Sequence, residues 1–151
     1  MKFFLLFSLL LPSLSWAYPA LGDFVHYEAK FEDAYVKLEK TVLSHDTVEN
    51  TFEVRTFMTF KGNVLQNDIH VLPYSFLYTP EKVASVIKNC EAREGMITEL
   101  VVQSIPMSVC EFYNEESQLT NMIGPVPFGV VRFQVYLQGE DFLDFNLTSF
   151  N

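Results

Sequence analysis

Residues 52–73 read FEVRTFMTFKGNVLQNDIHVLP, and this stretch decides the fold class. Over 52–60, alternate side chains are apolar or β-branched, while Glu53 and Arg55 lie between them. A period of two predicts a β-strand with one buried face. Lys61-Gly62-Asn63 predicts a turn. A second strand is expected from Val64 to Leu72, bounded by Pro73, which has no N–H for a strand ladder.

The same alternation recurs on both sides of this stretch. Toward the N-terminus, Val25, Tyr27, Ala29 and Phe31 share one face of an expected strand. A second such face holds Val36, Leu38, Lys40 and Val42, with Lys40 as its polar exception. Further strands are expected at 97–104, 109–113, 131–137 and 142–150. Pro106 is expected in a turn or bulge, and the polar segment 114–121 in a loop.

One amphipathic helix is expected after Thr79. Thr79 suits the N-cap, Pro80 the first helical position, and Glu81 the positive end of the helix dipole. Four apolar positions then follow at helical spacing: Val83, Val86, Ile87 and Cys90. Such a stripe needs a surface to pack on.

These elements predict an α+β fold that is mainly β. We expect a curved antiparallel sheet or incomplete barrel of seven or eight strands, with one inserted helix that could cover the concave face.

The first seventeen residues, MKFFLLFSLLLPSLSWA, have the layout of a secretory signal peptide. Lys2 is followed by an apolar run that is too short for a membrane anchor, and Ser15 and Ala17 suit a signal peptidase. The alternative is a buried N-terminal helix. We therefore expect residues 1–17 to be a signal peptide and 18–151 a single β-rich domain. This domain would lie in the periplasm or outside the cell, without an integral membrane span.

The charge of the chain argues against nucleic acid as a partner. The full chain has ten basic and nineteen acidic residues. Removing Lys2 with the signal leaves nine basic residues and a net charge of −10. Binding to nucleic acid or to an anionic membrane surface needs clustered Lys and Arg instead.

The chain has two cysteines, Cys90 and Cys110. An isolated pair in an exported protein predicts a structural disulfide. The alternative is a redox or metal pair, but catalytic thiols normally form C-x-x-C, and two thiols alone do not complete a zinc site.

No residue set has the pattern of a catalytic, metal or cofactor site. Ser44-His45-Asp46 brings triad residue types together, but neighbours on a strand point to opposite faces. A polar turn is the better interpretation there. His26, His45 and His70 show no metal-ligand spacing and fall on separate elements. We therefore expect no enzyme. A hydrolase using a histidine or dispersed carboxylates is the alternative in that class.

Aromatic content is the one unusual feature of composition. Without the signal, twelve Phe and seven Tyr remain in 134 residues. They indicate either an ordinary aromatic core or a pocket for an apolar ligand. The leading hypothesis is an exported, non-catalytic binding protein for a lipid or other apolar ligand, held between sheet and helix. The alternative is a protein–protein interaction or structural module of the cell envelope. No individual ligand-binding residue can be assigned.

The C-terminal region carries a resemblance. Residues 126–132, VPFGVVR, followed by a hairpin that ends Leu147-Thr148-Ser149-Phe150, resemble the end of uncharacterised periplasmic proteins of Gram-negative bacteria. The expected architecture is also similar to that of the periplasmic lipoprotein carriers of the LolA and LolB type. The resemblance implies non-enzymatic handling of a lipid or an envelope component, and it assigns no functional residue.

Overall fold

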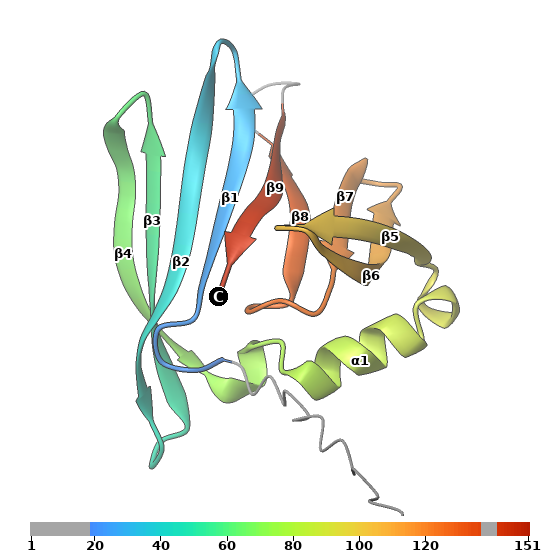
Figure 1. Cartoon of the computed structure of the whole chain (residues 1–151), viewed down its shortest axis with the longest axis horizontal. Helices are drawn as coiled ribbons and strands as arrows, with labels where there is room; N and C mark the ends of the chain where they lie inside the picture. Colours follow the sequence, from blue (N-terminus) through green and yellow to red (C-terminus); the bar gives the residue numbers. More distant parts are fainter. Residues whose placement is uncertain (1–18, 137–141) are drawn as a thin grey trace, which may run out of the picture.

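The computed structural model of the chain describes residues 19–136 and 142–151. These residues form one antiparallel sheet and one α-helix, α1 (Pro80–Lys88), with the short 3-10 turns η1 (Tyr74–Phe76) and η2 (Glu91–Arg93) (Figure 1). The predicted mainly β, α+β fold is confirmed. The strands are β1 (Phe24–Phe31), β2 (Ala34–Asp46), β3 (Thr51–Phe60), β4 (Asn63–Pro73), β5 (Met96–Val102), β6 (Ile105–Asn114), β7 (Leu119–Ile123), β8 (Val130–Tyr136) and β9 (Phe142–Phe150).

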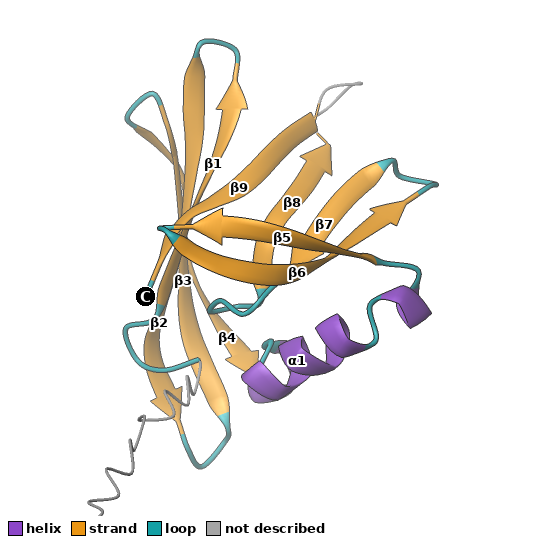
Figure 2. Cartoon of the chain, turned by 45° about the vertical axis from the view of Figure 1, so that its right-hand side comes forward, coloured by secondary structure: helices purple, strands orange, loops and turns teal. Residues whose placement is uncertain are grey.

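The sheet is strongly curved but not closed. Its strand order is β4-β3-β2-β1-β9-β8-β7-β6-β5, so β4 and β5 are its two edges. Although three strands separate them in this order, β5 and β9 are in contact. The backbone N–H of Phe150 also donates to Gln103 Oε1, just after β5, at 3.2 Å. The β9-to-β5 half therefore curls back on itself, while β1 to β4 extend from it (Figure 2).

The main core fills the inside of this curl. Val25 and Tyr27 of β1 pack in one cluster with Val109, Val131 and Phe145 from β6, β8 and β9. Each of these side chains is almost completely buried. The period-two pattern explains this arrangement, because alternate residues of every strand point to the concave face.

Helix α1 begins as the sequence predicts and packs on β6 and β7. Thr79 Oγ1 accepts a hydrogen bond from the backbone N–H of Lys82 at 3.3 Å, and Pro80 is the first helical residue. Val83 and Val86 are buried against Ile123 and the two cysteines. Within 19–136 and 142–151, no helix is long and apolar enough to cross a membrane.

The strands differ from the sequence-based prediction in two respects. Nine strands are present in the described residues instead of seven or eight, because β7 occupies the second part of the segment expected as a loop. Pro106 lies inside β6 and pairs with Val101, so it is not in the turn. That turn comes earlier, at Gln103 and Ser104, which both have positive φ. The expected signal peptide 1–17, Leu137 and the expected turn 138–141 lie outside the described residues.

Candidate functional site

An apolar groove runs along the concave face, where β2, β3 and β4 face β8 and β9. It consists of three neighbouring hollows of about 510, 440 and 360 Å³. The first hollow, beside the segment that leads into α1, shares Lys40, Phe128 and Phe133 with the second. The second shares Met58, Val135 and Phe145 with the third. We call these hollows helix-side, central and hairpin-side, and together the groove.

The pleat of the strands explains why the groove is apolar. On β3, Val54, Thr56 and Met58 all line the central hollow, because they are two residues apart. Met58 is only partly buried, and Val135 keeps 38% of its surface exposed. Apolar atoms therefore remain accessible along the groove instead of being sealed in the core.

Three aromatic rings pack against one another in one wall of the groove. Phe133 stacks on Phe145 with ring centroids 4.9 Å apart, and Tyr27 meets Phe133 edge-on at 5.2 Å. The Tyr27 hydroxyl donates to the carbonyl oxygen of Val130 at 2.8 Å. Burial raises the pKa of this phenol, so it stays neutral at physiological pH.

The loop 124–129 and Tyr78 form the helix-side end. Phe128 has a φ of 63° and lines both the helix-side and central hollows. Gly129 has a φ of 68°, and a Cβ placed there would lie 2.3 Å from Cβ of Tyr78. Only glycine fits this close approach. Tyr78 precedes α1, and no residue of α1 lines the groove. The groove thus lies between strands, and α1 packs outside the helix-side end of the groove.

Lys40 is the one lysine in the groove wall. It lines the helix-side and central hollows, and burial lowers the pKa of its ammonium below the ordinary 10.5. His70 is the other basic residue of the wall. None of the residues that line the three hollows is Asp or Glu. An acidic protein thus has a groove without acidic side chains in its walls.

The structure pairs Cys90 and Cys110 in a disulfide, with their Cα atoms 5.6 Å apart. Both residues are fully buried, and the bond joins the segment after α1 to β6. A Cβ on Gly95 would lie 2.6 Å from Cys110 Sγ, so the chain passes directly over the bridge. The disulfide lies outside the groove walls.

The residues Ser44, His45 and Asp46 do not form a catalytic group. They end β2, and the turn follows them. The His45 ring stacks on Phe52 at 4.0 Å, whereas the Ser44 hydroxyl donates to Glu53 Oε2 at 2.6 Å. Asp46 Oδ1 accepts the backbone N–H groups of Val48 and Glu49, and these hydrogen bonds lower the pKa of Asp46. In the described part of the chain, no three His, Cys, Asp or Glu side chains gather to hold a metal ion.

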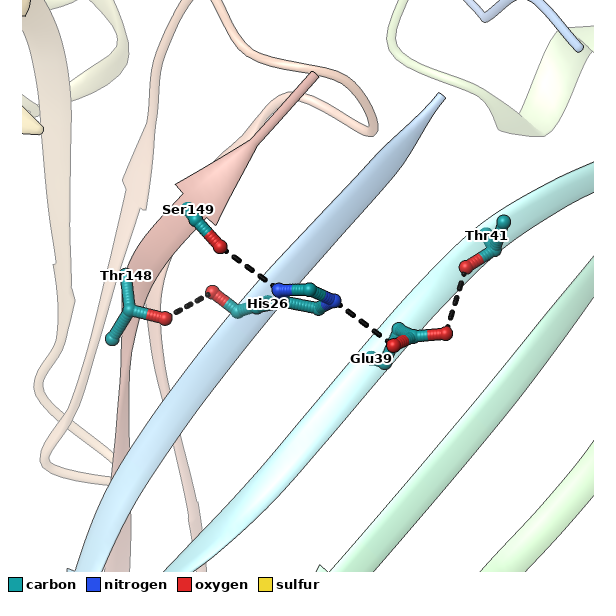
Figure 3. Close-up of polar contacts among 5 residues, drawn as sticks. All are labelled: His26, Glu39, Thr41, Thr148 and Ser149. Carbon is teal, nitrogen blue, oxygen red and sulfur yellow. Dashed lines mark hydrogen bonds and ion pairs between the residues drawn. The ribbon is translucent and has the colours of Figure 1, made fainter. Parts of the chain in front are cut away.

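A different polar network, missed by sequence reasoning, lies on the outer face (Figure 3). His26 Nδ1 lies 2.8 Å from the Ser149 hydroxyl, and His26 Nε2 lies 2.9 Å from Glu39 Oε2. Thr41 donates to the other oxygen of the Glu39 carboxylate at 3.0 Å. In the sequence, His26 and Glu39 stand out only as residues on the polar sides of their strands. Their contact with each other and with Ser149 depends on the pairing of β1 with β2 and β9, and the pairing with β9 is not local.

This network has the connectivity of a Ser-His-Glu triad and lines a hollow of about 420 Å³ on the outer face, but the hydrogen-bond donors around Ser149 are not arranged as in such a triad. Acyl transfer needs N–H donors aimed at the developing oxyanion. The N–H that follows Ser149, on Phe150, donates to Gln103 Oε1 instead. His26 and Glu39 are 40% and 36% exposed, so water reaches both side chains. The contacts chiefly link β9, β1 and β2 across the outer face.

The free edge of β4 is a second feature of interest. It exposes Val64, Leu65, Ile69 and Val71, each by more than half of its surface. Asp68 is its only acidic or lysine/arginine side chain. Edge strands normally carry Lys, Pro or bulges that prevent pairing with another chain. β4 has a bulge opposite Met58 and Thr59 and ends at Pro73, but its apolar side chains remain exposed.

No family model, no curated protein and no solved structure matches this chain. Function is therefore inferred from three features of the structure: the groove, the outer-face network and the β4 edge.

Proposed function

We propose that the protein is an exported, non-catalytic binding protein that holds the apolar chain of a lipid in the groove. One observation carries the proposal: an acidic protein has a long apolar groove whose lining contains no Asp or Glu. Each hollow has a volume in the range of about 300–1,000 Å³ that is usual for small-molecule sites.

The energetics favour a flexible hydrocarbon chain. Burial of each methylene is worth roughly 0.8 kcal/mol. A chain of about ten methylenes would therefore gain on the order of 8 kcal/mol before the costs of ordering it are subtracted. Aromatic and aliphatic walls such as Phe133 and Val135 suit this contact, because they offer no competing hydrogen bonds.

The disulfide supports export, since such bonds persist in oxidising compartments. Within this proposal residues 1–17 are the signal, and the mature chain works in the periplasm or outside the cell. The resemblance to lipoprotein carriers of the LolA and LolB type rests on the curved sheet and inserted helix, and it is part of the proposal. A fold alone does not assign a ligand.

Titration with 1-N-phenylnaphthylamine, an uncharged apolar fluorophore, tests the proposal. Its emission should rise with the wild-type protein. Val135→Glu places a charge between the central and hairpin-side hollows at a position that tolerates it, because Val135 is already 38% exposed. This variant should lose most of the signal. The matched control, Val71→Glu, changes an exposed valine on the outer face of β4 and should keep it. A wild-type protein that does not bind the fluorophore would refute the proposal.

The β4 edge favours a second candidate, an interaction module of the cell envelope. A partner strand could add to β4 through backbone hydrogen bonds, with Ile69 and Val71 in contact with its side chains. The same two variants separate the candidates. A single stoichiometric protein partner that is lost with Val71→Glu and kept with Val135→Glu would support the edge over the groove.

A further inference from the structure

The position of Lys40 breaks the apolar pattern of β2 at the middle of the groove. Val36, Leu38 and Val42 lie on the same face and are buried. In the sheet Lys40 pairs with Val25 on β1 and Thr56 on β3. Its side chain therefore lies in an apolar wall where the strand pattern alone would place a valine or leucine.

The ammonium of Lys40 has no ion pair or hydrogen bond with any described residue, unlike several other cations of the chain. Lys61 Nζ lies 2.8 Å from Asp33, and Lys82 Nζ donates to the carbonyl oxygen of Ser75 at 2.6 Å. Arg132 forms a two-point contact with Asp144. A half-buried cation without a partner costs stability, so its presence in a wall that could be apolar requires an explanation.

The acidic residues nearest by register do not supply a partner. Asp23 lies one strand away, beside Val42, and its carboxylate accepts the backbone N–H of Ala20 at 2.7 Å. Asp68 pairs with Thr56, two strands from Lys40 and on the same face. It is exposed, and its carboxylate accepts a hydrogen bond from Gln66 at 2.9 Å. Apart from Lys40 and His70, the polar side chains in the walls of the helix-side and central hollows are uncharged. Examples are Thr56, Gln66 and Asn121. An anion that pairs with Lys40 would therefore come from outside the described residues.

We propose that Lys40 binds the carboxylate of a long-chain fatty acid whose hydrocarbon tail lies in the groove. This inference rests on the proposed function and names its ligand class. Thr56 is the neighbour of Lys40 on β3, and its hydroxyl can donate a second hydrogen bond to the carboxylate. The central hollow continues into the hairpin-side hollow, where Phe31, Phe60 and Leu143 provide an apolar path for the tail. The middle of the groove then recognises the charge of the ligand, and the hairpin-side hollow recognises the length of its tail.

The test compares oleate with oleyl alcohol, which has the same chain without the charge. Both are used to displace 1-N-phenylnaphthylamine from the full mature protein. Oleate should bind the wild type at least about tenfold more tightly, because a charge-assisted hydrogen bond in a half-buried site is worth about that ratio. Lys40→Met should remove the preference while keeping the affinity for the alcohol within about twofold. The control Lys37→Met removes an exposed outer-face lysine that pairs with Glu28, and it should keep the preference.

Each other outcome has a defined meaning. Equal binding of acid and alcohol by the wild type, with binding of the fluorophore intact, overturns the role of Lys40 and leaves the apolar groove standing. A preference that survives Lys40→Met also overturns it. Tighter binding of dodecyl phosphate than of dodecanoate would overturn the assignment of a carboxylate. Failure of every probe, including the fluorophore, would refute the proposed function itself.

Discussion

The half-buried ammonium of Lys40 destabilises the folded protein when no ligand is bound. Burial lowers the pKa of Lys40, so the folded chain holds this proton less tightly than the unfolded chain does. Below the folded pKa both states are protonated, and the full penalty applies. As the pH rises through the folded pKa toward 10.5, the folded state releases its proton first and the penalty disappears.

This sign gives a prediction for Lys40→Met without ligand. The variant should be more stable than the wild type at pH 7 by about 0.5–2 kcal/mol, the usual gain from one stabilising substitution. This difference in stability should shrink as the pH approaches 10.5, because the wild type is no longer destabilised once Lys40 has lost its proton. Urea denaturation at a series of pH values measures it. The other groups on this face, including His70, Tyr78 and Asp68, are the same in both proteins. A constant difference across the pH range would contradict the account.

The Ser149–His26–Glu39 network should be inert as a nucleophile. Its serine lies on an exposed sheet face, and the adjacent N–H is directed at Gln103. A fluorophosphonate probe should therefore leave Ser149 unlabelled, and Ser149→Ala should leave fluorophore binding unchanged. Intact-mass spectrometry reads the first result directly. Stoichiometric labelling of Ser149 that is lost in His26→Ala would instead identify a hydrolase.

Among the contacts that join one element to another, the disulfide has the largest expected effect on stability. It joins the end of the helical segment to β6, and both cysteines are buried with Val83 and Val86. Replacing either cysteine with serine should cost about 2–5 kcal/mol. The double variant should be about as unstable as each single one, because the energy belongs to the bond. Denaturant melts and thiol counting on the unfolded, non-reduced protein measure this. Two free thiols in the wild type would contradict it.

Local signals predicted most elements well. The alternation in β3 and the Thr79 cap both depend on neighbours in sequence, so they were visible without the fold. β7 was not visible, because its Thr120 and Asn121 are polar and its stability comes from pairing with β6 and β8. Pro106 is tolerated inside β6 at the start of the strand, where sequence reasoning expected a break.

The groove is a property of the complete fold and could not be predicted from the sequence. It exists because β8 and β9, late in the chain, face β2 to β4, and because β5 curls back to β9. Such pairings are not local. The sequence showed Lys40 as an exception within an apolar pattern, but only the fold places this lysine in a groove without acidic residues.

Export of the chain has its own test. Trp16 is the only tryptophan and precedes the proposed cleavage site after Ala17. The exported protein should therefore begin at Tyr18 and show tyrosine emission alone. N-terminal sequencing and fluorescence spectra of the purified exported form check both points. Indole emission, or an N-terminus upstream of Ala17, would contradict a cleaved signal peptide.

Native mass spectrometry tests directly whether the groove holds a lipid chain. The exported protein, purified without detergent, should carry a bound amphiphile that organic extraction releases and identifies as a fatty acid. Val71→Glu should retain this adduct, whereas Val135→Glu should lose it. A wild-type protein that carries no lipid, and gains none when incubated with oleate or oleyl alcohol, would contradict the account.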